Sequence, residues 1–201
     1  MRAGLIILVV LGACGAWAAG EAGNYPAIEG YSTESAVRVN SDGTTMVTSQ
    51  KEYYGKDKYR FDFDTKMSGK TFSGSTIVRF DKDLQWVLMP ERNAYVENSL
   101  TPDLKAKLKH DMPREMAKKF KFVGTETLNG QAVDKYDYSN EKCQSSYGYV
   151  ARDSGLPVKS ESTCGTDQLS VEYTNTKAGL PPDDLFEVPA GLKKMDLHQP
   201  S

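Results

Sequence analysis

Apolar and polar residues alternate in short segments along most of the chain, from about residue 31 onwards. The clearest segment is 59–64, in which aromatic residues alternate with charged ones, and 169–174 alternates in the same way. Alternation with a period of two is typical of a β-strand that buries one face. Turn signals separate the segments, and Asn129-Gly130 is typical of a two-residue hairpin turn. The pattern predicts a mainly antiparallel sheet that is curved or nearly closed.

Residues 101–120 break this pattern and contain many good helix formers. Apolar residues recur there at every fourth position: Leu104, Leu108, Met112, Met116 and Phe120. This spacing places them on one broad face of a helix. Thr101 can cap the start of the helix, with Pro102 at the first helical position. Because Pro113 lacks a backbone donor, we expect a kinked helix or two short helices, lying as a lid across the sheet.

Residues 1–18 have the three-part layout of a secretory signal peptide. One positive charge at Arg2 precedes an apolar run over residues 5–13, and small residues stand before the expected cleavage site. A permanent membrane helix is disfavoured, because the run is shorter than the roughly 20 residues that span a bilayer. The alternative is a lipobox leader of residues 1–13, after which Cys14 is lipidated and becomes the N-terminus. Both routes predict export to the periplasm, and the second anchors the protein to a membrane through Cys14.

Without the leader the chain keeps an even pair of cysteines, Cys143 and Cys164, which in an oxidising compartment predicts a disulfide. Residues 147–151 and 158–163 are predicted to be two strands joined by a turn at 153–155. The register of this hairpin, continued outwards, brings the two cysteines within about a residue of facing each other. A redox-active pair is the alternative, but such pairs usually lie as close as Cys-x-x-Cys.

Composition narrows the class of protein. The 201 residues are 39% hydrophobic and 26% charged, with a mean hydropathy of −0.53, as expected of a soluble globular chain. A net charge of −2 and an isoelectric point near 5.8 argue against a nucleic-acid partner, since nucleic-acid binders usually carry a basic excess. We expect one domain over residues 31–195, after a flexible lead-in at 19–30 and before a tail at 196–201.

Little in the sequence points to catalysis. The two histidines, His110 and His198, have no nucleophile placed near them by a motif, and no Gly-x-Ser-x-Gly segment is present. The acidic stretches 81–83 and 183–184 lack the spacing and the terminal Glu of a calcium loop, and turn or cap roles suit them better. We therefore expect no enzyme activity, no catalytic residue, no cofactor and no metal site.

Four parts of the chain carry an ordered pattern: 77–81 with 86–91 and 95–97, then 123–130, then 149–150 with 154–159, and finally 185–191. In this order they resemble the LolA/LolB-like superfamily of envelope proteins, and more closely its DUF4412-type branch. The resemblance implies a half-open antiparallel β-barrel of about eleven strands, with helices over its concave face. Members bind lipid acyl chains there, as in outer membrane lipoprotein sorting, or serve as ligand-binding domains of envelope regulators. Fold alone leaves the function open.

The candidate ligand-binding residues are apolar side chains of the aromatic strands and of the helical segment. They are Tyr59, Phe61, Phe63, Trp86, Leu88, Tyr95, Leu104, Leu108, Met112 and Met116. We expect a lipid, a lipoprotein acyl chain or another apolar ligand to bind among them, for transfer or sensing, driven by burial of apolar surface. The alternative is a filled core without a ligand, in a protein-interaction or sensor module of the envelope. Alternation alone leaves open which face of each strand is concave.

The partners expected of this protein follow from the same residues. Besides the apolar ligand, an envelope protein is an expected partner, and the protein is expected to be a monomer. Lysines and an arginine gather in the helical segment: Lys105, Lys107, Lys109, Arg114, Lys118 and Lys119. Such a cluster is most often a solvated face, and the alternative is peripheral contact with anionic headgroups of a membrane.

Overall fold

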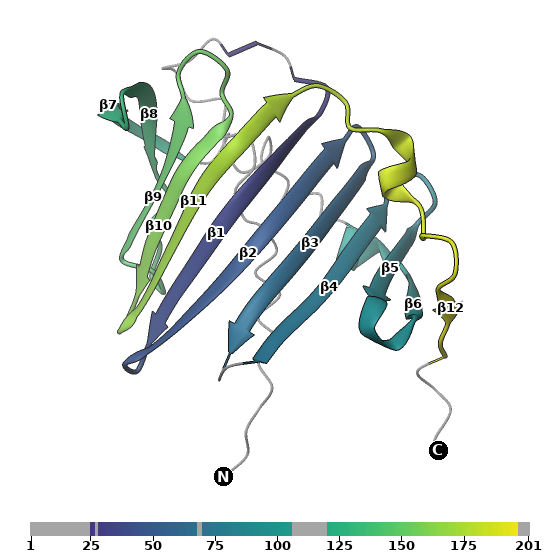
Figure 1. The fold of residues 1–201 in the computed structure, drawn as a ribbon. Coiled ribbons are helices and arrows are strands. Elements are labelled where there is room, and N and C mark those ends of the chain that lie inside the picture. Colours follow the sequence, from purple (N-terminus) through teal and green to yellow (C-terminus); the bar gives the residue numbers. More distant parts are fainter. Residues whose placement is uncertain (1–24, 27, 68–69, 106–119, 197–201) are drawn as a thin grey trace.

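One curved sheet dominates the structure, a computed structural model that describes residues 25–26, 28–67, 70–105 and 120–196 (Figure 1). Its order is β12-β6-β5-β4-β3-β2-β1-β11-β10-β9-β8-β7. The strands are β1 (Tyr31–Ser41), β2 (Thr44–Gly55), β3 (Lys58–Met67), β4 (Lys70–Arg79), β5 (Leu84–Met89), β6 (Ala94–Ser99), β7 (Lys121–Leu128), β8 (Gln131–Asp137), β9 (Ser145–Ala151), β10 (Pro157–Cys164), β11 (Asp167–Ala178) and β12 (Lys193–Lys194). Two 3-10 helices, η1 (Pro90–Arg92) and η2 (Asp183–Phe186), and a helical stretch at residues 102–105 accompany the strands.

The predicted fold class, a mainly β protein built on an open antiparallel sheet, is confirmed. Within the described residues, strands β1 to β11 pair with their neighbours antiparallel, and only the two-residue β12 pairs parallel, with β6. The first strand and the last long strand of the chain lie side by side in the middle of the sheet. There β1 pairs with β11 on one side and with β2 on the other. The hairpin turn predicted at Asn129-Gly130 joins β7 to β8, and both residues have the positive φ angles, 51° and 81°, that this turn needs.

Two faces of the sheet can be told apart from the strand register. We call the face that carries Tyr59 and Phe61 the inner face, and the face that carries Arg60 the outer face. Leu104 and Phe120, which lie at the two borders of the segment 106–119, both pack against clusters of the inner face. The predicted helix start agrees with the structure: residues 102–105 are helical, and the Leu104 backbone N–H donates to the Thr101 hydroxyl at 3.2 Å.

The hairpin of β9 and β10 carries the predicted disulfide between Cys143 and Cys164. The pairing of Ser162 with Ser146 places the two cysteines near each other. Cys164 is the last residue of β10, and Cys143 lies just before the first residue of β9. The bond closes the open end of the hairpin, as the register argument predicted.

Replacing Cys143 and Cys164 together by serine is expected to lower the free energy of unfolding by about 3 kcal/mol, because the bond restricts the unfolded chain. It joins residues 21 positions apart. Urea unfolding of the oxidised protein and of the double variant measures the difference. A reducing agent should shift the unfolding midpoint of the native sequence and leave that of the double variant unchanged. Coincident curves for the two oxidised proteins would contradict the expectation.

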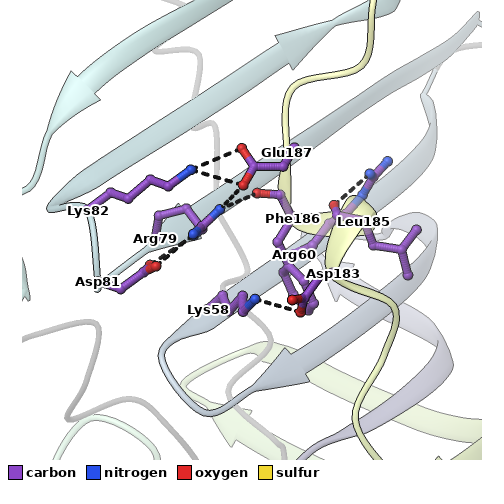
Figure 2. A network of polar contacts seen from close by, with 9 residues as sticks. All are labelled: Lys58, Arg60, Arg79, Asp81, Lys82, Asp183, Leu185, Phe186 and Glu187. Carbon is purple, nitrogen blue, oxygen red and sulfur yellow. Dashed lines mark hydrogen bonds and ion pairs between the residues drawn. The ribbon is translucent and has the colours of Figure 1, made fainter.

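The C-terminal segment leaves β11, passes through η2 and ends in β12 beside β6, far from β11 in the order of the sheet (Figure 1). Two basic side chains of β3 hold η2 against the outer face (Figure 2). Lys58 Nζ lies 2.7 Å from Asp183 Oδ1, and Arg60 Nη1 donates to the backbone oxygen of Leu185 at 2.9 Å. The acidic residues 183–184 therefore begin a helical turn, in line with the turn or cap role that suits them from the sequence, and this turn is tied to the sheet.

Arg79, at the end of β4, makes the second attachment of this segment (Figure 2). It donates to the backbone oxygen of Phe186 at 3.2 Å and forms ion pairs with Asp81 and Glu187. Lys82 also reaches Glu187, with Nζ 2.9 Å from Oε1. The hydrogen bonds from Arg79 lower the pKa of Asp81 to about 2, so this carboxylate stays charged at neutral pH. The guanidinium is buried, its three nitrogens all donate hydrogen bonds, and it fixes the path of the chain across the sheet.

Candidate ligand-binding face

An aromatic cluster occupies the inner face of β1, β2 and β3. The ring centroids of Tyr31 and Tyr54 lie 4.4 Å apart, those of Tyr54 and Tyr59 4.6 Å apart, and those of Phe61 and Phe63 5.4 Å apart. Val78, Phe80, Leu100 and Leu156 complete the buried cluster, and Leu104 packs against it. We call this set the aromatic cluster. It forms because cross-strand neighbours on one face pair their side chains, as Tyr54 does with Tyr59.

A second apolar cluster covers the inner face on the other side of β1. Its buried members are Val37, Tyr136, Val150, Val171 and Tyr173, from β1, β8, β9 and β11. Between the two clusters the inner face is polar. One cross-strand row runs from Tyr173 through Ser35 and Gln50 to Phe63, so two buried polar residues lie between an aromatic residue of each cluster.

The polar part of the inner face is nearly closed to solvent. Thr33, Ser35, Thr48, Gln50 and Glu52 line it on β1 and β2, and each is at most 8% exposed. Ser146, Ser160 and Ser162 continue it on β9 and β10. An unpaired polar group is costly away from water, so protein cores are mostly apolar. A buried strip of polar side chains is therefore unusual.

Glu52 is the charged member of this strip and is fully buried. The Tyr54 hydroxyl donates to Glu52 Oε2 at 2.7 Å, and the Ser35 hydroxyl lies 3.4 Å from Glu52 Oε1. Burial raises the pKa of Glu52 to about 7, and these two hydroxyl contacts only partly oppose it. Within the described residues no lysine or arginine pairs with this carboxyl group.

Asp134 on β8 is a second buried carboxylate, and unlike Glu52 it has several hydrogen-bond and charged partners. The Tyr25 hydroxyl donates to it at 2.5 Å, Thr125 donates at 2.8 Å, and Arg152 Nε lies 3.8 Å away. The Tyr25 ring also lies against Gly155, where an added Cβ would meet it at 2.8 Å. Asp134 thus holds the chain before β1 against the end of the sheet, and its partners account for its burial.

The structure brings together some of the candidate ligand-binding residues. Tyr59, Phe61, Phe63 and Leu104 all belong to, or pack against, the aromatic cluster of the inner face. Tyr59 and Phe61 are buried, and Phe63 and Leu104 are half-buried. These four residues form the described part of the candidate site.

Trp86, Leu88 and Tyr95 lie on the other side of the sheet, which corrects the expectation of a single lining set. Trp86 pairs with Ile77, and Ile77 pairs with Arg60, so the three strands turn these side chains to the outer face. There Trp86 and Leu88 bury against Phe186 of the C-terminal segment, and Tyr95 packs at the border of that cluster. No cavity of the inner face can include them.

Several further predictions fall outside the described residues. They concern Leu108, Met112 and Met116 of the expected lid, Cys14, and the other residues of the leader. The assignment of these residues to a lid, a lipid anchor and a signal peptide stays a prediction.

On the outer face, β1 to β4 form an open trough of about 380 Å³. Glu34, Lys51, Asp62 and Asp64 are among its polar lining residues. Lys51 Nζ lies 3.1 Å from Glu34, so the charges of the trough are partly paired. In the part of the chain that the structure describes, no three acidic, His or Cys side chains gather as metal ligands, and no helix is long and apolar enough to cross a membrane.

Comparison with known proteins gives matches of fold only. No protein-family model and no curated protein matches the chain. A crystal structure of an uncharacterized conserved protein from Thermus thermophilus is similar to it, with a TM-score of 0.57 and 10% sequence identity over 83% of this chain and 89% of that one. At this identity the match establishes the open-sheet fold and nothing about the ligand.

Two further solved structures match with lower scores. A LolA superfamily protein from Nitrosomonas europaea has a TM-score of 0.41 and 12% identity, over 82% of this chain and 92% of that one. LprF from Mycobacterium bovis has a TM-score of 0.43 and 10% identity, over 76% and 89%. At these scores and identities the two matches carry no argument about the family, so the assignment to the LolA/LolB-like superfamily and to its DUF4412-type branch stays a prediction.

Proposed function

We propose that this protein binds a lipid acyl chain, or another apolar ligand, at the inner face of its sheet without catalysing a reaction. The aromatic cluster carries the proposal. Tyr59, Phe61 and Phe63 follow one another along the inner side of β3, and Leu104 of the helical segment after β6 packs against the same cluster. An apolar chain lying along this row would bury surface on both sides, which favours binding by about 25 cal/mol for each Å² removed from water.

The proposal places the protein in the periplasm, and the leader and the disulfide support this location. A signal peptide at residues 1–18 would export the protein to the periplasm, where Cys143 and Cys164 stay oxidised. We assign the chain to the LolA/LolB-like superfamily, whose members bind acyl chains or serve as ligand-binding domains of envelope regulators, and to its uncharacterised DUF4412-type branch. The proposed protein is a monomer, with residues 31–195 as its ligand-binding domain.

Mass spectrometry of an organic extract tests this function directly. The protein is purified without detergent from the periplasm of a cell that produces it, and its extract is compared with that of an equally treated periplasmic enzyme. A lipid or lipopeptide in stoichiometric amount is the expected result. An extract that stays clean, even after incubation with envelope lipids, would overturn the proposal and favour the protein-interaction module with a filled core.

A further inference from the structure

Three oxygen atoms converge at the polar part of the inner face. The Ser35 hydroxyl lies 3.2 Å from Gln50 Oε1 and 3.4 Å from Glu52 Oε1. A single hydroxyl proton cannot satisfy both of these acceptors. Glu52, Gln50 and Ser35 are all buried, at 0%, 4% and 5% exposed. The Ser35 hydroxyl therefore serves one of these two acceptor oxygens at a time, and the other needs a donor from elsewhere.

The carboxylate of Glu52 is the least satisfied of the three groups. An ionised carboxylate can accept about four hydrogen bonds, and among the described residues one full-strength donor, the Tyr54 hydroxyl, reaches it. The Tyr59 hydroxyl, on a ring packed against Tyr54, is also buried and makes no hydrogen bond of standard geometry with the described residues. A buried carboxylate without a cation costs stability, and either protonation or a bound molecule that supplies donors relieves this cost.

We infer that the ligand of the inner face is an amphiphile with a protonated amino group, which binds Glu52 while its alkyl chain lies along the aromatic cluster. This inference rests on the proposed function and adds the headgroup chemistry. Tyr54 links the two parts of the site, because its hydroxyl donates to Glu52 and its ring packs between Tyr31 and Tyr59. The polar head of a ligand bound at Glu52 therefore lies next to the start of the apolar row that holds its alkyl chain.

An ammonium group fits this set of atoms better than a metal ion does. It presents three donors, and the Ser35 hydroxyl oxygen lies within 3.4 Å of two further acceptors, the Gln50 amide oxygen and the Glu52 carboxylate. A hard cation such as Ca²⁺ needs six to eight oxygen ligands and usually several carboxylates. Among the described residues no group of three such acidic, His or Cys ligands exists.

Three probes with the same alkyl chain test the headgroup: dodecylamine, dodecanol and dodecanoate. Isothermal titration calorimetry is run on the mature protein at about pH 8, where the alkylamine is still protonated, and below the concentrations that form micelles. We expect dodecylamine to bind at least about tenfold more tightly than dodecanol, because a charge-assisted bond to a buried acid is worth that much. Dodecanoate should bind most weakly, because its charge repels that of Glu52.

Glu52→Gln removes the charge and keeps the shape of the side chain, so the preference for dodecylamine over dodecanol should disappear. Glu172→Gln makes the same chemical change on the outer face of β11, where the side chain is exposed, and should keep the preference. Circular dichroism checks that both variants fold. Since the comparison of the three probes on the native sequence needs no variant, a folding defect in Glu52→Gln would leave that test intact.

The outcomes separate the two proposals. Equal binding of dodecylamine and dodecanol to the native sequence, or a preference that survives in Glu52→Gln, would overturn the inference about the headgroup and leave the proposed function standing. Binding of none of the three probes would overturn both.

Discussion

Replacing Phe186 by alanine is expected to lower the free energy of unfolding by about 3–5 kcal/mol, the usual cost of removing a buried aromatic side chain. Phe186 is 1% exposed and packs on the outer face against Ile77, Trp86 and Leu88. It lies in η2, a 3-10 helix of four residues that has few internal bonds of its own. Its side chain is therefore the main apolar contact that holds the C-terminal segment to β4 and β5.

The unfolding of this variant can be followed through the fluorescence of Trp86 in protein produced from residue 19 onwards, in which Trp86 is the one tryptophan. The indole loses its packing against Phe186, so its fluorescence should change in the folded state as well. Leu180→Ala is the matched control, since Leu180 belongs to the same segment but is 59% exposed. That variant should change the unfolding midpoint little. Equal effects of the two substitutions would show that the segment is not docked through Phe186.

Local patterns predicted the elements of this fold well. The alternation at residues 59–64 became part of β3, the Asn129-Gly130 turn joined β7 to β8, and the hairpin register placed Cys143 beside Cys164. These features depend on neighbours in sequence or on a single hairpin. Backbone geometry over such short stretches of sequence follows from side-chain periodicity and from the residues of the turns.

The candidate site was harder to predict, because its residues come from different strands. Alternation separates the two faces of one strand, but it does not say which face continues onto the next strand. For Trp86 the answer depends on two pairings, of Ile77 with Trp86 and of Arg60 with Ile77. An aromatic residue also fits both a ligand-facing surface and a surface covered by the C-terminal segment, so residue type gives no further guidance.

Glu52 was missed for a related reason. Its strand, β2, alternates polar residues with polar residues: Gln50 and Glu52 face inward, and Ser49 and Lys51 face outward. A hydrophobic pattern therefore gives no sign of which face is buried. The one signal in the sequence is the Glu52-x-Tyr54 spacing, which puts a carboxyl group beside an aromatic residue on the same face. The burial of Glu52 becomes visible only when the inner faces of β1 to β3 are assembled.

Replacing Glu52 by glutamine is expected to raise the free energy of unfolding by about 3 kcal/mol above pH 8 and to leave it almost unchanged near pH 4. Burial raises the pKa of Glu52 from its usual 4.5 to about 7 in the folded protein. Between these values the folded state keeps a proton that the unfolded state has released, so raising the pH favours unfolding. The native sequence therefore loses this stability as the pH rises through about 7, and the glutamine variant does not.

Urea unfolding of both proteins at several pH values measures this difference. The change in stability over this pH range is due to Glu52 and not to its partners, because burial holds the pKa of Tyr54 well above 10 and Ser35 does not titrate. Glu172→Gln, on the exposed outer face, should show no such widening gap. A constant difference between the native sequence and Glu52→Gln at every pH would mean that Glu52 is not buried as a titrating acid. An amine bound at Glu52 stabilises the carboxylate, so saturating dodecylamine should narrow the gap at high pH and leave it unchanged near pH 4.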